Sequence, residues 1–148
     1  MTRAKKRRIF FEAPKLKWQF IRQKAEKFRR NYVKPIDLVP VPIIEIVELE
    51  LGIQPIPKAG LKRRIDIDGF LTNNLKYICV DLDVYMDERQ INRLRFIYAH
   101  EIGHLILHKN EIRQCDFRTP DDWCRRTLLC RNAFSKEYFE CYFELGKN

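Results

Sequence analysis

The chain has 148 residues, which suits one domain and leaves too little for two independent cores and a linker. With 45% hydrophobic and 33% charged residues and a net charge of +9, the composition excludes wholesale disorder and collagen-like or low-complexity sequence. The longest apolar runs have four or five residues, far below the roughly 18 needed to cross a bilayer, and no signal-peptide core follows Arg7 and Arg8. The five cysteines are odd in number and form no CxxC pair, which predicts reduced thiols. These features predict a cytoplasmic protein with no membrane span.

The positive charge is concentrated in residues 1–34, which hold thirteen Lys or Arg against two Glu, whereas the remaining residues carry a net charge of −2. Residues 1–14 form a basic arm in the sequence, and apolar residues recur with helical spacing over 15–32. The pattern predicts either a core-packing helix with a solvated basic face or a surface that contacts nucleic acid or an acidic partner. Because no helix-turn-helix or zinc-finger spacing accompanies it, we expect any nucleic-acid contact through residues 1–34 to be sequence-neutral.

The middle of the chain predicts a short helix followed by short strands, after Pro35 and Pro40 end the first helix. Alternation of isoleucine and aspartate over 65–68 has the period of a half-buried strand. The predicted elements are a helix over 43–51, a strand over 53–56, a turn over 57–60, a strand over 64–71 and a strand over 75–84. They indicate an α+β domain with a small, mostly antiparallel sheet.

A long helix is predicted from Asp87 or Glu88 to His108, because apolar residues recur there on more than one face. Such a helix is central and buried. Beyond it the pattern predicts helices over 123–131 and 135–145, and the second of these begins at the N-cap candidate Ser135.

An HExxH motif, His100-Glu101-Ile102-Gly103-His104, lies on the long helix. Residues four apart are about 40° apart around an α-helix and about 6 Å apart along it, so both imidazoles can point a nitrogen at one ion. Neutral imidazoles suit zinc, which in catalytic sites takes a third protein ligand and keeps one position for water. Glu101 projects beside the histidines, where it can accept a proton from water during hydrolysis of a peptide bond.

Other interpretations of the histidines stay open. Histidines on an apolar helix can be ordinary core residues, although burying a Glu and two imidazoles without partners would cost several kcal/mol. His108 lies about 80° round the helix from His100, so we expect it to cap the helix or to support a ligand. Nitrogen and carboxylate ligands also accept cobalt, manganese or iron, which leaves the identity of the metal open.

Residues 93–108 resemble the signature helix of the ImmA/IrrE metallopeptidases, a family found in bacteria, phages and mobile elements. The segment reads RLRFIYAHEIGHLILH, which is similar to the family's Arg-Phe, Ala-His-Glu-x-Gly-His and closing Leu-His. Weaker similarities over 42–46, 51–53 and 68–71 extend the resemblance to roughly residues 35–145. The resemblance implies a zincin-like single domain around a central HExxH helix, preceded here by an N-terminal basic helix.

The resemblance also implies the third zinc ligand, which the family supplies as a glutamate from a downstream helix, usually within Glu-Ala-Asn-x-Phe-Ala. The matching position here is Glu140, within the sequence ECYFEL. The implied metal ligands are therefore His100, His104 and Glu140, with Glu101 as the catalytic base.

The last predicted helix leaves alternatives to Glu140, because Glu137 and Glu144 lie three and four residues away on the same face. Cys141 is a further, softer donor beside them. The family's next hydrophobic segment has no counterpart after Leu145, so we expect a metallopeptidase domain over 15–148 that is shortened at its C-terminus.

The family resemblance implies a zinc-dependent endopeptidase that cleaves a specific protein partner, a transcriptional repressor or similar helix-turn-helix regulator. The alternative is a non-catalytic zinc-containing regulatory protein that binds a regulator or nucleic acid through its basic arm. A third hypothesis is a toxin–antitoxin or phage accessory module whose activity depends on a partner chain. Substitution of Glu101 separates the first hypothesis from the second, because both retain the metal.

Overall fold

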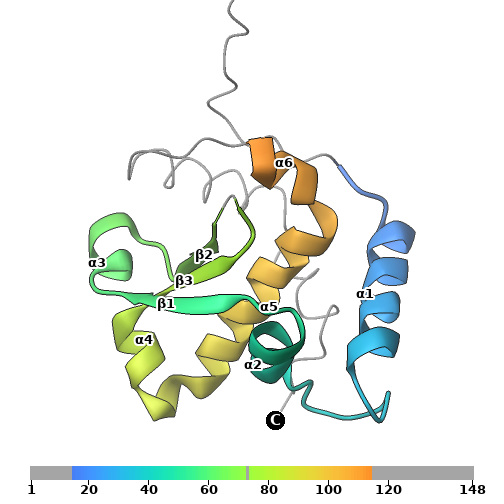
Figure 1. Ribbon diagram of the computed structural model, residues 1–148, viewed down its shortest axis with the longest axis horizontal. Helices are drawn as coiled ribbons and strands as arrows, with labels where there is room; N and C mark the ends of the chain where they lie inside the picture. The colour runs from blue at the N-terminus through green and yellow to red at the C-terminus, as the bar shows by residue number, and fades with distance from the viewer. Residues whose placement is uncertain (1–14, 73, 115–148) are drawn as a thin grey trace, which may run out of the picture.

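A computed structural model describes residues 15–72 and 74–114 of the chain, and these form an α+β unit with a small mixed sheet (Figure 1). The elements in chain order are helix α1 (Trp18–Tyr32), helix α2 (Ile43–Glu45), the π-helical turn η1 (Ile46–Glu50), strand β1 (Gln54–Lys58), helix α3 (Leu61–Ile65), strand β2 (Gly69–Leu71), strand β3 (Tyr77–Asp81), helix α4 (Leu82–Met86), the 3-10 turn η2 (Glu88–Gln90), helix α5 (Ile91–Leu107) and helix α6 (Lys109–Gln114). The arm over 1–14 and the helices predicted over 123–131 and 135–145 lie outside the described residues.

The sheet has the strand order β1-β3-β2, and its longer ladder is parallel. β1 pairs in parallel with β3 from Gln54↔Tyr77 to Lys58↔Asp81, while β2 pairs antiparallel with β3 from Gly69↔Val80 to Leu71↔Ile78. The prediction of a mostly antiparallel sheet is therefore wrong. Parallel neighbours need a crossover rather than a hairpin, and the chain between β1 and β3 supplies one through α3 and β2.

Prolines occupy the outward positions of β1. Gln54 donates its N–H to the Lys76 carbonyl at 3.0 Å, so the N–H groups of Ile56 and Lys58 face β3 as well. Pro55 and Pro57, which have no N–H, lie at the alternate positions and remove no bond from the ladder.

The strand predicted over 64–71 is correct only at its end, because residues 61–65 form α3 and the strand is confined to 69–71. Asp66 adopts a left-handed backbone conformation (φ 53°) and donates its N–H to the Lys62 carbonyl, which ends the helix. The alternation of isoleucine and aspartate therefore crosses a helix end rather than following a strand. The strand predicted over 75–84 likewise stops at Asp81, where α4 begins, and β1 runs on to Lys58 through half of the predicted turn.

The predictions for the first two helices agree with the structure to within a few residues. α1 starts at Trp18, three residues later than predicted, and buries Ile21 and Phe28. The helix predicted over 43–51 is present as α2 and η1, with Ile43, Ile46 and Val47 buried. Its last turn widens to π-helical spacing before Leu51.

α5 is the centre of the unit, as predicted, and lies between the sheet and α1 (Figure 1). It packs against β2, β3, α1, α2 and α4. Tyr98 on this helix is fully buried and donates its hydroxyl to Glu48 Oε1 at 2.8 Å, so one core hydroxyl joins α5 to η1. Burial, followed by this hydrogen bond, raises the pKa of Tyr98 and keeps it a donor. In the part of the chain described, no helix combines the length and apolar character needed to cross a membrane.

Candidate metal centre

The two histidines of the HExxH sequence meet on one face of α5. The Nε2 atoms of His100 and His104 lie 3.2 Å apart, and the ring centroids are 4.9 Å apart. His104 is buried, with 1% of its surface exposed, whereas His100 is half-buried at the rim. The predicted convergence of the two rings is therefore present in the structure.

The separation of the two nitrogens fits a shared tetrahedral zinc ion. Two nitrogens bound at about 2.0–2.1 Å in tetrahedral geometry lie about 3.3 Å apart. The 3.2 Å between the Nε2 atoms of His100 and His104 matches this value without movement of either ring. The donor set also suits the metal, because imidazole nitrogens are ligands that zinc accepts and both rings project from one helix.

Glu101 is held by the edge strand of the sheet. Its Oε2 accepts the backbone N–H of Leu71 at 2.9 Å, and the side chain is 6% exposed. In β2 the residues on either side of Leu71 bond toward β3, as the Thr72 N–H to Tyr77 O bond shows, so the Leu71 N–H points away from β3 toward α5. The hydrogen bond from Leu71 therefore orients the Glu101 carboxylate beside the two histidines, whose Nε2 atoms converge without it.

Gly69 lets β2 approach α5 closely enough for this contact. A Cβ at position 69 would lie 2.7 Å from the Cys79 carbonyl oxygen and 2.7 Å from Ile97 Cγ2, both too close for any side chain. Because Ile97 belongs to α5, the absent side chain sets the distance between the strand and the HExxH helix.

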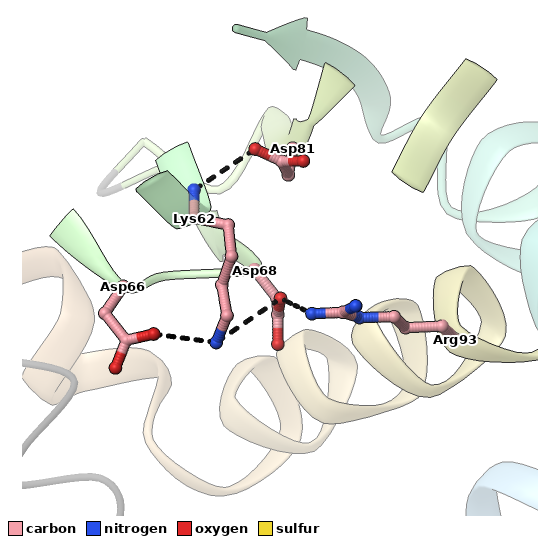
Figure 2. Close-up of polar contacts among 5 residues, drawn as sticks. All are labelled: Lys62, Asp66, Asp68, Asp81 and Arg93. Carbon is pink, nitrogen blue, oxygen red and sulfur yellow. Dashed lines mark hydrogen bonds and ion pairs between the residues drawn. The ribbon is translucent and has the colours of Figure 1, made fainter. Parts of the chain in front are cut away.

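Charged residues fix the same strand from its other end. Figure 2 shows the Asp68 carboxylate between Arg93 of α5 and Lys62 of α3, with Arg93 in an ion pair and Lys62 Nζ at 4.0 Å. Lys62 also pairs with Asp66 at 2.8 Å, and its backbone N–H donates to Asp81 Oδ1 at 3.1 Å. Arg93 thereby joins the start of β2 to α5 about two helical turns before His100.

His108 supports His104 from the end of the helix. It is the C-cap residue of α5, is 2% exposed, and places its Nδ1 3.1 Å from Nδ1 of His104. If Nε2 of His104 is to offer its lone pair to a metal, its Nδ1 must carry the proton and donate to His108. The geometry therefore places His108 at the end of α5 and in contact with His104, which is the position predicted for it.

Substitution of His108 tests this arrangement. We expect His108→Ala to weaken zinc binding about 10- to 100-fold, because His104 loses the group that holds its ring and tautomer. His108→Asn, whose side-chain oxygen can accept the same proton, should recover part of the affinity. Competition with a chelator of known affinity measures both variants, and unchanged affinity in His108→Ala would contradict the supporting role.

Some features of the centre have no signature in the sequence. The donor to Glu101 is the backbone N–H of Leu71, and the residue type of Leu71 gives no basis for predicting this contact. The ion pair of Asp68 with Arg93 joins residues 25 apart, although each is charged and next to a recognisable motif. Cys79 of β3 is free and buried, and burial raises the pKa of its thiol, against an opposing effect of Lys58 and with a smaller increase from Glu101.

The residue that the resemblance implies as a third ligand lies outside the described part of the chain. This residue is Glu140, and the alternatives Glu137, Cys141 and Glu144 lie outside that part as well. Within 15–72 and 74–114, no three His, Cys, Asp or Glu side chains come together in a group able to hold a metal. The described part of the centre is therefore two imidazoles, a neighbouring carboxylate and a supporting imidazole.

Comparison with protein-family models, with curated proteins and with solved structures found no match to the chain.

Proposed function

We propose that the protein is a zinc-dependent endopeptidase that cleaves a specific protein partner in the cytoplasm. The observation that carries the proposal is the convergence of His100 and His104 Nε2 at 3.2 Å beside the oriented carboxylate of Glu101. The resemblance of residues 93–108 to the ImmA/IrrE metallopeptidases supports it and suggests a zincin-like arrangement, with Glu140 as the third ligand.

The residues of the chain divide the work of hydrolysis among them. His100, His104 and Glu140 would hold the metal, which when bound would polarise a peptide carbonyl as a Lewis acid and acidify water. Glu101 accepts a proton from the attacking water on its carboxylate and passes it to the departing amine. The Leu71 N–H keeps that carboxylate in place through Oε2, so that little reorganisation is needed during the reaction.

The proposed partner is a helix-turn-helix transcriptional regulator, as the family resemblance implies. The test is incubation of the zinc-loaded protein with a regulator encoded beside it, followed by mass spectrometry of the products. A single pair of new termini that requires zinc supports the proposal. Absence of cleavage in every such regulator would favour the alternative below.

The alternative function is a non-catalytic regulatory protein in which zinc is structural and the basic N-terminal region binds a regulator or nucleic acid. The exposed cations of α1 favour it. The two functions differ at one residue, because only the peptidase needs the carboxylate of Glu101.

The third ligand can be identified by comparing three neighbouring glutamates. We expect Glu140→Ala to lower zinc affinity by orders of magnitude, because it removes one of three protein ligands. Glu137→Ala and Glu144→Ala should leave the affinity nearly unchanged and serve as matched controls. Zinc titration of the three variants decides the assignment, and a large loss in a control with none in Glu140→Ala would overturn it.

A further inference from the structure

The positive charge of the described chain is gathered on one helix. Residues 15–34 carry eight Lys or Arg and one Glu, a net charge of +7, whereas residues 35–114 carry ten basic and twelve acidic side chains. α1 lies on the side of the unit opposite α3 and β1 (Figure 1). The excess charge therefore belongs to one surface rather than to the whole molecule.

Two of these cations have hydrogen-bonding or ion-pair partners within the chain, so they are left out of the stripe defined below. Arg22 forms an ion pair with Glu26 at 3.0 Å. The guanidinium of Arg29 donates to the backbone carbonyls of Ile36 and Leu38, which holds the segment after α1 against the helix.

Five of the six remaining cations form a stripe with an aromatic ring in it. The stripe, which we call the basic stripe, consists of residues spaced three or four apart: Lys17, Phe20, Lys24, Lys27, Arg30 and Lys34. Helical spacing places Phe20, Lys24, Lys27 and Arg30 along one side of α1, which is about 22 Å long. Lys17 is the N-cap of the helix, and Lys34 follows its C-cap Val33. Among the described residues, no carboxylate forms an ion pair with any cation of the stripe.

The ring of Phe20 is exposed and associated with a cation. Its side chain is 42% exposed, and Lys24 Nζ lies 5.3 Å from the ring centroid. A π-face next to a flexible ammonium group suits a nucleobase stacked on the ring with its phosphate near the lysine. An acidic protein would use the cations but has no need of the ring.

The packing of α1 argues against a lipid surface as the partner. An amphipathic helix binds a membrane by inserting its apolar face. In α1 that face carries the buried Ile21 and Phe28, which belong to the core shared with α5. Membrane insertion would have to unpack the helix, whereas phosphates can contact the basic stripe without any rearrangement.

We propose that the basic stripe of α1 binds single-stranded nucleic acid without sequence preference, by phosphate contacts to its cations and stacking of a base on Phe20. This binding is independent of the proposed peptidase activity, so Glu101→Gln should bind nucleic acid as the unmodified protein does.

The test is fluorescence anisotropy of a labelled oligothymidine of about 20 nucleotides with the full chain, between about 50 and 200 mM salt. Contacts from the five cations of the stripe predict a slope of log affinity against log salt of about −3.5. Lys24→Gln with Lys27→Gln should weaken binding at low salt at least about tenfold and make the slope shallower by about 1.4. The matched control is Arg63→Gln with Arg64→Gln, exposed positions on α3 that carry the same charge, and it should behave as the unmodified protein.

Phe20→Ala separates stacking from charge. We expect it to weaken binding of the oligothymidine about fivefold or more, with an unchanged salt slope and no effect on duplex DNA of the same length. Circular dichroism shows whether each variant keeps the fold, and all substituted side chains are at least partly exposed.

Equal losses in the α1 and α3 double variants, or no binding by the unmodified protein at low salt, would overturn the proposal. Unchanged binding by Phe20→Ala would overturn the stacking contact and with it the preference for single strands. Binding to vesicles of anionic lipid without binding to the oligothymidine would replace nucleic acid by a membrane as the partner.

Discussion

Glu101→Gln should retain zinc and the fold but lose at least about 100-fold in turnover of a cleaved partner. The amide oxygen of glutamine can still accept the Leu71 N–H, which holds the native carboxylate at 2.9 Å, so the strand contact survives. The amide cannot take a proton from water, and that is the step the proposal assigns to this residue. Rates with the same regulator, together with metal content of both proteins, measure the effect.

The control for this substitution is Glu88→Gln in η2, an exposed carboxylate away from the histidines. It should leave cleavage and zinc content unchanged. Turnover by Glu101→Gln equal to that of the unmodified protein would remove Glu101 from the role of base. Loss of zinc in Glu101→Gln would instead make it a structural part of the metal centre.

His104→Ala should abolish stoichiometric zinc binding and give the largest loss of affinity among the histidine variants. His104 is the middle of the buried series, 3.2 Å from His100 Nε2 and 3.1 Å from His108 Nδ1, so its removal takes away a ligand and the link to its support. The loss should exceed the roughly 10- to 100-fold expected when only an outer partner is removed. Elemental analysis after dialysis gives the metal content.

His100→Ala provides the second measurement, because His100 is half-buried and its removal leaves a smaller gap in the core than removal of His104. Both variants should lose the metal while the secondary structure of His100→Ala persists. An N–H···N hydrogen bond between two imidazoles also accounts for a separation of 3.2 Å. If both variants kept one zinc per chain, that hydrogen bond would be the correct interpretation of the pair.

The parts of the fold that depend on helical periodicity could be predicted from the sequence. α5 carries apolar residues over most of its circumference, and α1 separates a buried side at Ile21 and Phe28 from a charged one. These long patterns specify both the helices and the side of α5 on which the two histidines meet.

Short elements could not be predicted in the same way, because their boundaries depend on single backbone conformations. Asp66 ends α3 in a left-handed conformation. A glycine at this position would have predicted that helix end from the sequence, whereas an aspartate does not. The parallel pairing of β1 with β3 depends on the path of the crossover, and no local pattern encodes it.

The candidate site likewise contains one part that could be predicted from the sequence and one that could not. His100, Glu101 and His104 follow from a spacing of four on one helix, and the position of His108 follows from four more residues. The contact of Glu101 with Leu71 joins residues 30 apart through a backbone donor. It depends on how closely β2 approaches α5, which only the packed structure determines.

The imino acids of β1 have a consequence for the behaviour of the protein at high concentration. An edge strand with a full row of outward N–H groups is a template on which another chain can extend the sheet. In β1 both outward positions are prolines, Pro55 and Pro57, so the strand offers a second copy no N–H group there. At the opposite edge, the N–H of Leu71 is already engaged by a carboxylate of its own chain. In the sheet formed by the described residues, both edge strands therefore offer few free N–H groups to another chain, β1 because of its prolines and β2 because Glu101 accepts the N–H of Leu71.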